Sequence, residues 1–209
     1  MTPSATYETR RSELLEAEAA LRDQRERVAE LRRALPEGPL VDDYTLRAVP
    51  GGEDVQLSSL FGDHDSLVVY HFMFGADWDA GCPMCSMWLD GLDGVAHHIG
   101  ESAGFAVIAK ASPSTLAAWA ERRGWRRLRL YSSGETSFGS DLDVENETGE
   151  PDAAVSVFRR RPDGTIELTY TGKADWGELG WRGIDLLSPV WQVLDLLPGG
   201  RGDWMPHNV

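Results

Sequence analysis

Two cysteines separated by two residues lie between a buried strand and a helix, and this combination constrains the fold more than any other feature of the sequence. The continuous apolar and aromatic run from Leu67 to Phe74 predicts a strand buried on both faces. Residues 82–99 predict a helix, with Cys85, Trp88, Leu92, Val95 and Ile99 on one face. Both cysteines, Cys82 and Cys85, therefore fall in the first turn of a helix that follows a buried strand.

The first turn of a helix changes the chemistry of a thiol. Its unpaired amide N–H groups and the positive end of the helix dipole stabilise a thiolate, so the pKa of Cys82 should fall below the free value of about 8.5. Pro83 has the fixed φ that suits the first helical position. Cys85 lies one turn further on and faces inward, within reach of a mixed disulfide on Cys82. We therefore predict that Cys82 is the attacking thiolate and Cys85 the resolving thiol.

Four further residues near the motif are candidate supporting residues. Carboxylates raise the pKa of a nearby thiol, so Asp77 and Asp79 favour a reducing dithiol. Trp78 is expected to form one wall of the site, or to pack over the edge of the sheet. Asp90 lies about one turn beyond Cys85 and either relays a proton for the resolving thiol or is a surface carboxylate.

A metal site is the main alternative to a reactive dithiol, and inert buried thiols are a third interpretation. Structural zinc sites use four ligands, and the sequence has no second cysteine pair. His71, on the preceding strand, could join Cys82 and Cys85, and two thiolates with an imidazole suit copper or zinc. The favoured interpretation of His71 is a buried histidine with a polar partner. We therefore expect no cofactor.

The remaining elements predict an α/β fold of the thioredoxin type with an added N-terminal helix. A parallel strand–helix–strand unit is followed by an antiparallel hairpin and a last helix. The expected strands are 105–111, 128–131, 154–158 and 165–170, and the expected helices are 113–123, capped by Ser112 and ended by Gly124, and 188–197. Pro162, Asp163 and Gly164 predict the hairpin turn. Before the core, residues 42–46 suggest an edge strand, and Ser132–Asp152 is expected to be a polar loop.

The N-terminal segment predicts one charged helix from Tyr7 to Leu35. Leu14, Leu21, Val28 and Leu35 recur every seven residues and form a narrow apolar seam. The seam either packs on the rest of the chain or pairs with a second copy in a homodimer. The expected organisation is an N-terminal helix over residues 1–38, a thioredoxin-like domain over 39–200 and a tail over 201–209.

Composition narrows the partners and the cellular location. A formal net charge of −14 argues against nucleic acid and membrane surfaces as partners. No apolar run approaches the roughly 20 residues that span a bilayer, and the charged N-terminus lacks the features of a secretory signal. The protein is therefore expected in the cytoplasm, where two cysteines in one motif indicate a reactive pair rather than a structural disulfide.

The motif also resembles that of a known bacterial family. Residues 71–75 with Asp77 and Trp78, then 81–83, 85–86, Trp88 and Asp90, are similar to the signature of the family called domain of unknown function 899. The similarity extends to the charged N-terminal helix and to residues 132–133, 155–158, 182–187 and 194–196. Members are predicted thioredoxin-like dithiol–disulfide oxidoreductases. The resemblance implies a thiol or disulfide substrate, either a protein or a small molecule, and an external reductant.

Two departures from related proteins qualify the expected activity. Thioredoxins carry a cis-proline before the strand that opens the hairpin, whereas here Ala153 stands near that position and Pro151 is the nearest proline. Peroxiredoxins resemble this chain in lacking that proline, but they place a Thr and an Arg around the reactive cysteine, and the Thr position here is Asp or Trp. Fast peroxidase activity is therefore not expected. A passive redox sensor that dimerises without catalysis is the remaining hypothesis.

Overall fold

The computed structural model describes residues 4–134, 136–174, 189–198, 202–203 and 205–208. The chain divides into two compact units, Met1–Gly38 and Pro39–Val209. The helices are α1 (Ala5–Arg33), α2 (Pro83–Ile99), α3 (Pro113–Arg123), α4 (Phe138–Asp141), α5 (Pro189–Leu194) and the 3₁₀-helix η1 (Leu57–Phe61). The strands are β1 (Leu40–Val41), β2 (Thr45–Ala48), β3 (Asp54–Gln56), β4 (Ser66–His71), β5 (Gly104–Ala109), β6 (Leu130–Ser132), β7 (Ala154–Arg160) and β8 (Ile166–Lys173).

The first unit consists mainly of the single helix α1. It has 29 residues, begins at the cap Ser4, whose side chain accepts a hydrogen bond from the Tyr7 amide, and has no buried residue. The side chains of the predicted seam are therefore exposed or only half-buried, and Leu21 is 53% exposed. The predicted bounds, Tyr7 to Leu35, differ from the observed ones by two residues at each end.

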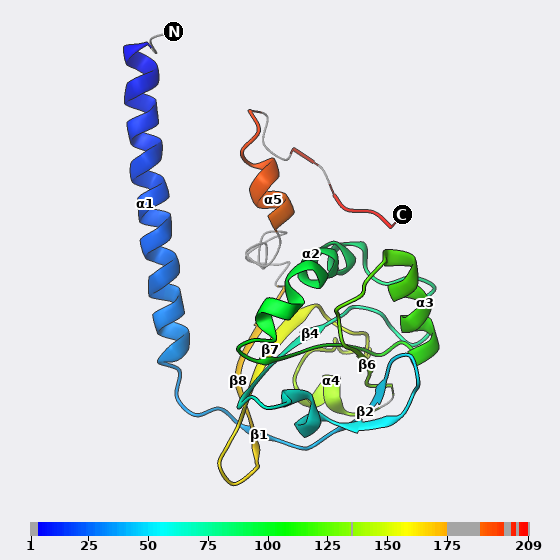
Figure 1. The fold of residues 1–209 in the computed structure, drawn as a ribbon. Coiled ribbons are helices and arrows are strands. Elements are labelled where there is room, and N and C mark those ends of the chain that lie inside the picture. The colour runs from blue at the N-terminus through cyan, green and yellow to red at the C-terminus, as the bar shows by residue number, and fades with distance from the viewer. Residues whose placement is uncertain (1–3, 135, 175–188, 199–201, 204, 209) are drawn as a thin grey trace. The chain divides into compact units, whose positions relative to one another are not determined.

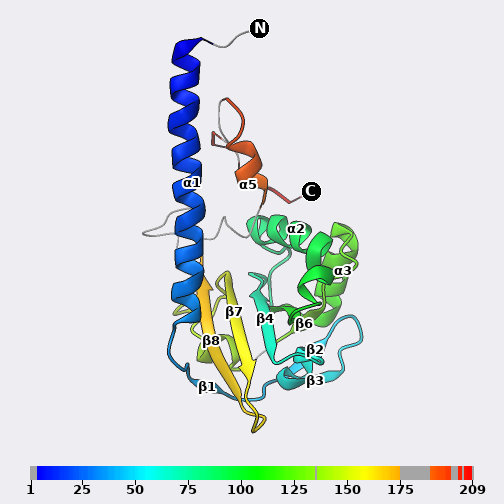
Figure 2. The ribbon, with the colours of Figure 1, turned by 60° about the vertical axis from the view of Figure 1, so that its left-hand side comes forward.

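The second unit is built on an eight-stranded sheet in the order β1-β8-β7-β4-β5-β6-β2-β3. Strands β4, β5 and β6 are parallel, and β7 pairs antiparallel with both β4 and β8. Figures 1 and 2 show β8, β7 and β4 side by side, with α2 and α3 over one face of the sheet. A parallel unit beside an antiparallel hairpin is the predicted thioredoxin-like arrangement, and the structure confirms it.

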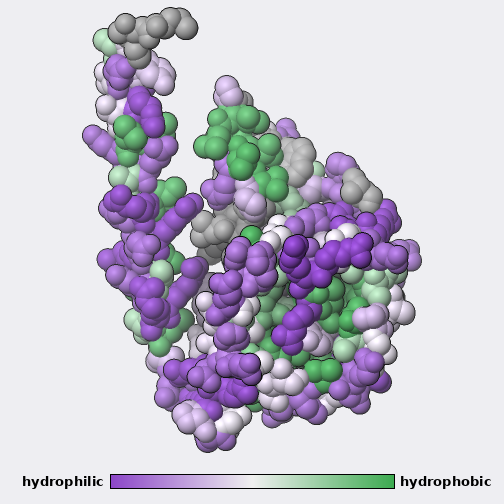
Figure 3. Space-filling view, in the orientation of Figure 1, coloured by the Kyte–Doolittle hydropathy of each residue, from purple (hydrophilic) through white to green (hydrophobic). Residues whose placement is uncertain are grey.

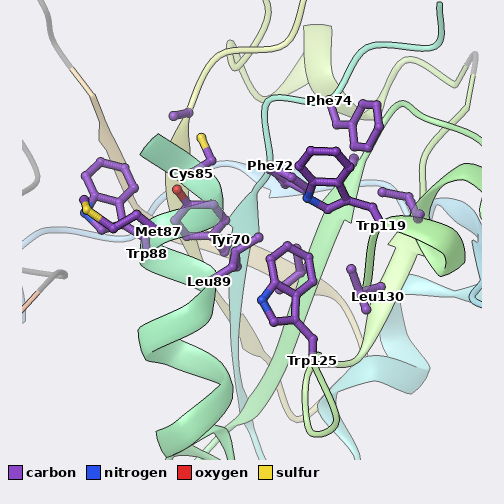
Figure 4. Packing of buried hydrophobic residues seen from close by; sticks show 14 of the residues in the cluster. Tyr70, Phe72, Phe74, Cys85, Met87, Trp88, Leu89, Trp119, Trp125 and Leu130 are labelled. Carbon is purple, nitrogen blue, oxygen red and sulfur yellow. The ribbon is translucent and has the colours of Figure 1, made fainter. Parts of the chain in front are cut away.

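Alternation along β4 divides the core into two layers. Successive strand residues point to opposite faces of a sheet. Tyr70 joins the cluster that includes residues of α2, α3 and α5, whereas Val69 joins the cluster formed with η1 and α4. Figure 4 shows part of the first cluster, in which Tyr70, Phe72 and Trp119 gather around one side of α2. Buried aromatic rings thus fix the position of α2 on the sheet.

The structure corrects two predicted segments. Residues 42–46 are not an edge strand, because the strand there is β2 and it pairs on both sides, with β3 and β6. Residues 132–152 are not an entirely polar loop, since α4 lies within them and Phe138, Leu142 and Val144 are buried. Those three apolar side chains cover the sheet face opposite α2. The predicted last helix is observed as α5, and its expected start at residue 188 lies outside the described residues.

The face of the molecule visible in Figure 3 is mainly hydrophilic. Figure 3 shows that hydrophilic residues cover most of the visible face of the molecule, with apolar side chains gathered in smaller areas. Among the residues that the structure describes, no helix has both the length and the apolar character that crossing a membrane requires.

Candidate functional site

The backbone between β4 and α2 brings the cysteine motif to the end of the central strand. Beyond β4 the chain still runs beside β5, because the Phe72 amide donates to the Ile108 carbonyl at 2.8 Å. It then turns back, and the Cys82 amide donates to the Met73 carbonyl at 2.9 Å. Cys82 is the N-cap of α2 and Pro83 its first residue, as the sequence predicts. The Cys82 side chain therefore lies at the amino end of this helix.

The two thiols differ in exposure and acidity. Both are free; Cys82 is partly exposed and Cys85 is fully buried. A hydrogen bond from the Cys85 thiol lowers the pKa of Cys82 to about 6; burial opposes this shift, and the amides of Cys85 and Met84 assist it. Burial, and then the neighbouring Cys82 sulfur, raise the pKa of Cys85. As the pH rises, Cys82 is thus the first of the two thiols to ionise. Attack by Cys82 and resolution by Cys85 require this order of ionisation.

Tyr70 lies beside the buried thiol. Figure 4 shows its hydroxyl oxygen close to the Cys85 sulfur, at the amino end of α2. The ring packs edge-on against Trp88, with 6.0 Å between ring centroids. The hydroxyl is buried and has no hydrogen-bond partner of ordinary geometry among the described residues. Its nearness to the Cys85 sulfur nevertheless offsets part of the rise in the pKa of Cys85 that burial causes. Burial, followed by Cys85, raises the pKa of Tyr70, so this side chain remains neutral.

Gly81 is the residue that lets the motif approach the sheet closely. A Cβ atom there would lie 2.3 Å from Cζ of Phe72. The Phe72 ring is fully buried and packs edge-on against both Phe74 and Trp125. On the other side, the Asn208 side-chain amide donates to the Gly81 carbonyl at 3.1 Å. The residue before Cys82 is therefore held between the aromatic core and the C-terminal segment.

The predicted supporting residues near the motif occupy different environments. Trp78 is half-buried and packs against the cluster that contains Cys85. Its indole lies so close to Gly75 that a Cβ atom there would be 2.6 Å from the indole nitrogen. Asp77 and Asp79 are exposed. The lowered pKa of Cys82 runs opposite to the effect expected of those two carboxylates.

Asp90 does not belong to the dithiol site. Its carboxylate forms an ion pair with Arg123 and accepts a hydrogen bond from the Trp125 indole at 2.8 Å. These contacts join α2 to the end of α3 and the residues after it. The partners of Asp90 thus lie on α3 and beyond it, which fits the alternative of a surface carboxylate.

His71 does not join the cysteines, which corrects the predicted metal site. Its ring stacks on Phe138, on the sheet face opposite Tyr70 and Cys85. The Nε2 atom lies 2.8 Å from the Ser156 hydroxyl, and burial lowers the pKa of His71 to about 3. Within the described ranges, no group of three His, Cys, Asp or Glu side chains could hold a metal ion. A neutral buried histidine with a polar partner, the favoured interpretation from sequence, is what the structure contains.

The segment before β7 also follows the sequence-based expectation. Ala153 is fully buried in the same cluster as Cys85 and immediately precedes β7. Pro151 lies on the opposite side, where it lines a small pocket beside His71. The cis peptide bond in the described residues is the one before Pro50. Ala153, which the sequence places near the position of the thioredoxin cis-proline, thus packs in the cluster that contains Cys85.

Sequence reasoning assigned no role to three residues of this site: Tyr70, Gly81 and Asn208. Tyr70 was part of an apolar run with no sign of which face it occupied. Gly81 carried a usable signal, because a glycine directly before a functional residue often marks close backbone approach. Asn208 lies in the predicted tail, and no local pattern connects it with a motif 127 residues away.

The fold and the paired thiols define a thioredoxin-fold protein with a dithiol at the start of a helix. The sequence matches, over residues 1–208, the family described as "Bacterial protein of unknown function (DUF899)". The chain belongs to this family, which confirms the resemblance seen in the motif. No curated protein matches the sequence.

Solved structures with the same fold include peroxiredoxins. Peroxidoxin BcpB from Mycobacterium tuberculosis has a TM-score of 0.54 and 17% identity, over 73% of this chain and 94% of that one. PrxQ from Xylella fastidiosa, a mutant, gives 0.52 and 12%, over 73% and 93%. A bacterioferritin comigratory protein from Xanthomonas campestris with alkyl peroxide reduction activity gives 0.51 and 15%, over 74% and 94%. At these identities the similarity establishes the thioredoxin fold alone.

Proposed function

We propose that this protein is a thiol–disulfide oxidoreductase in which Cys82 attacks and Cys85 resolves. The observation that carries the proposal is the asymmetry of the pair: a partly exposed thiol of lowered pKa at a helix N-terminus, beside a fully buried thiol of raised pKa. A pair of inert structural thiols does not need to differ in exposure and pKa. A reactive pair does, because it needs one accessible nucleophile and one protected resolving group.

The reaction follows from these positions. The Cys82 thiolate attacks a substrate disulfide, a new S–S bond forms to Cys82, and the other substrate sulfur leaves as a thiolate that takes up a proton. Cys85 then loses its proton and attacks the Cys82 sulfur, which releases the second substrate thiol. The substrate disulfide is reduced to two thiols, and Cys82 and Cys85 are oxidised to a disulfide. An external dithiol reductant restores the pair.

The pH dependence of alkylation tests the acidity of Cys82. With iodoacetamide and reduced protein, we expect the rate to be half-maximal near pH 6 and to reach a plateau at higher pH, because the thiolate is the reacting form. In Cys85→Ala the midpoint should rise, since the thiol that donates to Cys82 is gone. Cys85→Ser, which keeps a donor, is the matched control. A wild-type midpoint above about 8.5, the value of a free thiol, would contradict the proposal.

A thiol titration across glutathione redox buffers tests the pair as a unit. We expect a reversible transition in which two thiols disappear together. No reversible transition between reduced and oxidised protein would overturn the proposed function. A reversible transition without turnover of any disulfide would instead favour the passive redox sensor.

Peroxide is the second candidate substrate, because structures that share the fold include a protein with alkyl peroxide reduction activity. Here Cys82 would attack the peroxide, the O–O bond would break to give a sulfenic acid and an alcohol, and Cys85 would form the disulfide and release water. The sequence argues against a fast reaction, since Asp79 or Trp78 stands where peroxiredoxins place a threonine. Oxidation of Cys82 by an alkyl peroxide faster than by a small disulfide would favour the peroxidase.

A further inference from the structure

We propose that the Tyr70 hydroxyl donates a hydrogen bond to the Cys85 sulfur when that sulfur is ionised. This role rests on the proposed function, because it concerns the step in which Cys85 resolves the mixed disulfide. It assigns to the site a residue on β4, the strand next to α2, that no cysteine motif would identify.

The first argument is the cost of forming a thiolate at Cys85. The side chain is fully buried within an aromatic cluster, and a buried anion without partners is strongly disfavoured. Cys85 must nevertheless carry negative charge twice in each cycle: when it attacks the mixed disulfide, and when the reductant expels it from the Cys82–Cys85 bond. A donor beside this sulfur would lower the barrier to both steps.

The second argument is the state of the Tyr70 hydroxyl. It is buried and makes no hydrogen bond of ordinary geometry in the reduced protein. Leaving a buried hydroxyl unpaired costs stability, so such a group calls for a functional reason. Its oxygen lies close to the Cys85 sulfur (Figure 4), and the ring is held by its edge-on contact with Trp88. A small movement of the sulfur or the ring on ionisation would complete the bond.

The third argument excludes Tyr70 as a base. Its phenol stays protonated in this environment, so it holds a proton that it can share and has no capacity to accept another. The proton that leaves Cys85 therefore ends on the departing substrate thiolate and not on Tyr70. Tyr70 retains its own proton and stabilises the charge on sulfur.

A two-phase reaction with 5,5′-dithiobis(2-nitrobenzoate) separates the steps. Attack by Cys82 on this disulfide releases one coloured thiolate, and resolution by Cys85 releases a second. In Tyr70→Phe we expect an unchanged first phase and a second phase slowed about tenfold or more, as loss of a hydrogen bond to a charged group implies. The pH profile of the second phase should also move to higher pH.

Two controls distinguish this role from a structural one. Tyr44→Phe makes the same change on the opposite face of the sheet and should leave both phases unchanged. If Tyr70→Phe does not fold, 3-fluorotyrosine can replace all five tyrosines of the chain. Fluorination keeps the shape of the side chain and makes its hydroxyl more acidic. Among the described residues, Tyr70 is the only tyrosine in the buried cluster around Cys85. A second-phase pH profile that moves to lower pH supports the proposal.

The outcomes separate the two hypotheses. A wild-type protein without a second phase would overturn the proposed function and the role of Tyr70 with it. If wild type shows a normal second phase and Tyr70→Phe leaves its rate and pH profile unchanged, only the role of Tyr70 is overturned. The same conclusion holds for an unchanged fluorinated protein, should Tyr70→Phe not fold.

An independent observation concerns α1, and we also propose that its apolar seam pairs with the same helix of a second copy in antiparallel orientation. The seam residues Leu14 and Leu21 are each more than half exposed. The helix has 29 residues, and none of them is buried. A charged helix with a seven-residue apolar repeat is typical of a coiled coil, in which a second helix covers the apolar residues.

The charged residues beside the seam favour an antiparallel second copy as the partner of α1. The positions that flank the seam carry Glu13 and Glu18 in the first half of α1, and Arg25, Arg27 and Arg32 in the second half, with Arg11 as the exception. Parallel helices would place like charges together, Glu13 against Glu18 and Arg27 against Arg32 of the second copy. Antiparallel helices place Glu18 against Arg25 of the second copy and leave one kind of like-charge contact, Arg11 against Arg32.

Sedimentation of the full chain tests this pairing. We expect a mass of twice 23.1 kDa for wild type. Leu21→Glu should give monomers, whereas Leu15→Glu, the same kind of change at a position outside the seam, should not. Glu18→Arg should weaken the dimer, and adding Arg25→Glu should restore it. A monomeric wild type, or a dimer that Leu21→Glu leaves intact, would overturn the proposal; a dimer strengthened by Glu18→Arg would refute the antiparallel direction.

Discussion

Cys82→Ser is expected to reduce disulfide exchange to the background rate of the uncatalysed reaction. Serine keeps the shape of the side chain, but its hydroxyl does not ionise near neutral pH, so no nucleophile remains at the start of α2. Cys85 cannot replace it, because that thiol is fully buried and its pKa is raised. The measurement is the first phase of thiolate release from an aromatic disulfide, with the folded state followed by circular dichroism.

Cys85→Ser is the informative counterpart. This variant keeps Cys82 and a hydrogen-bond donor beside it, so the first attack should proceed and then stop at the mixed disulfide. Mass spectrometry should find one substrate thiol bound per chain, and adding dithiothreitol should release it. Full activity of Cys82→Ser, or continued turnover by Cys85→Ser, would show that the two cysteines do not have these roles.

Gly81→Ala is expected to destabilise the protein and to disturb the motif. The new methyl group would lie 2.3 Å from the Phe72 ring. That ring cannot move aside easily, since Phe74 and Trp125 pack against it with centroids at 5.6 and 5.9 Å. Overpacking of this kind costs about 1–3 kcal/mol. Urea denaturation should show the loss, and alkylation should show a changed reactivity of Cys82.

Gly94→Ala is the matched control on the same stretch of chain. Gly94 lies inside α2, and a Cβ atom there would meet nothing within 4 Å. Because alanine restricts the unfolded chain and favours a helix, we expect roughly 0.5–1 kcal/mol of added stability. Equal effects of the two substitutions would contradict the packing argument for Gly81.

The class of fold and the place of the dithiol followed from local sequence patterns. A helix such as α3, with Ser112 as its cap and Gly124 at its end, is specified by residues within one or two turns. The hairpin turn before β8 is likewise local. Cys82 and Pro83 begin α2 for reasons contained in the motif itself. Local signals of this kind do not depend on how distant segments pack.

The surroundings of the dithiol depended on the tertiary structure. β4 is apolar along both faces, so its alternation could not show that Tyr70 faces Cys85 while His71 faces Phe138; the neighbouring layers decide this. Asp90 finds its partners 33 and 35 residues further along, where no helical spacing can reveal them. The sequence by itself determined where the cysteine pair lies. Only the packing of α2 on the sheet decided which side chains support it, because contacts between distant segments exist only after folding.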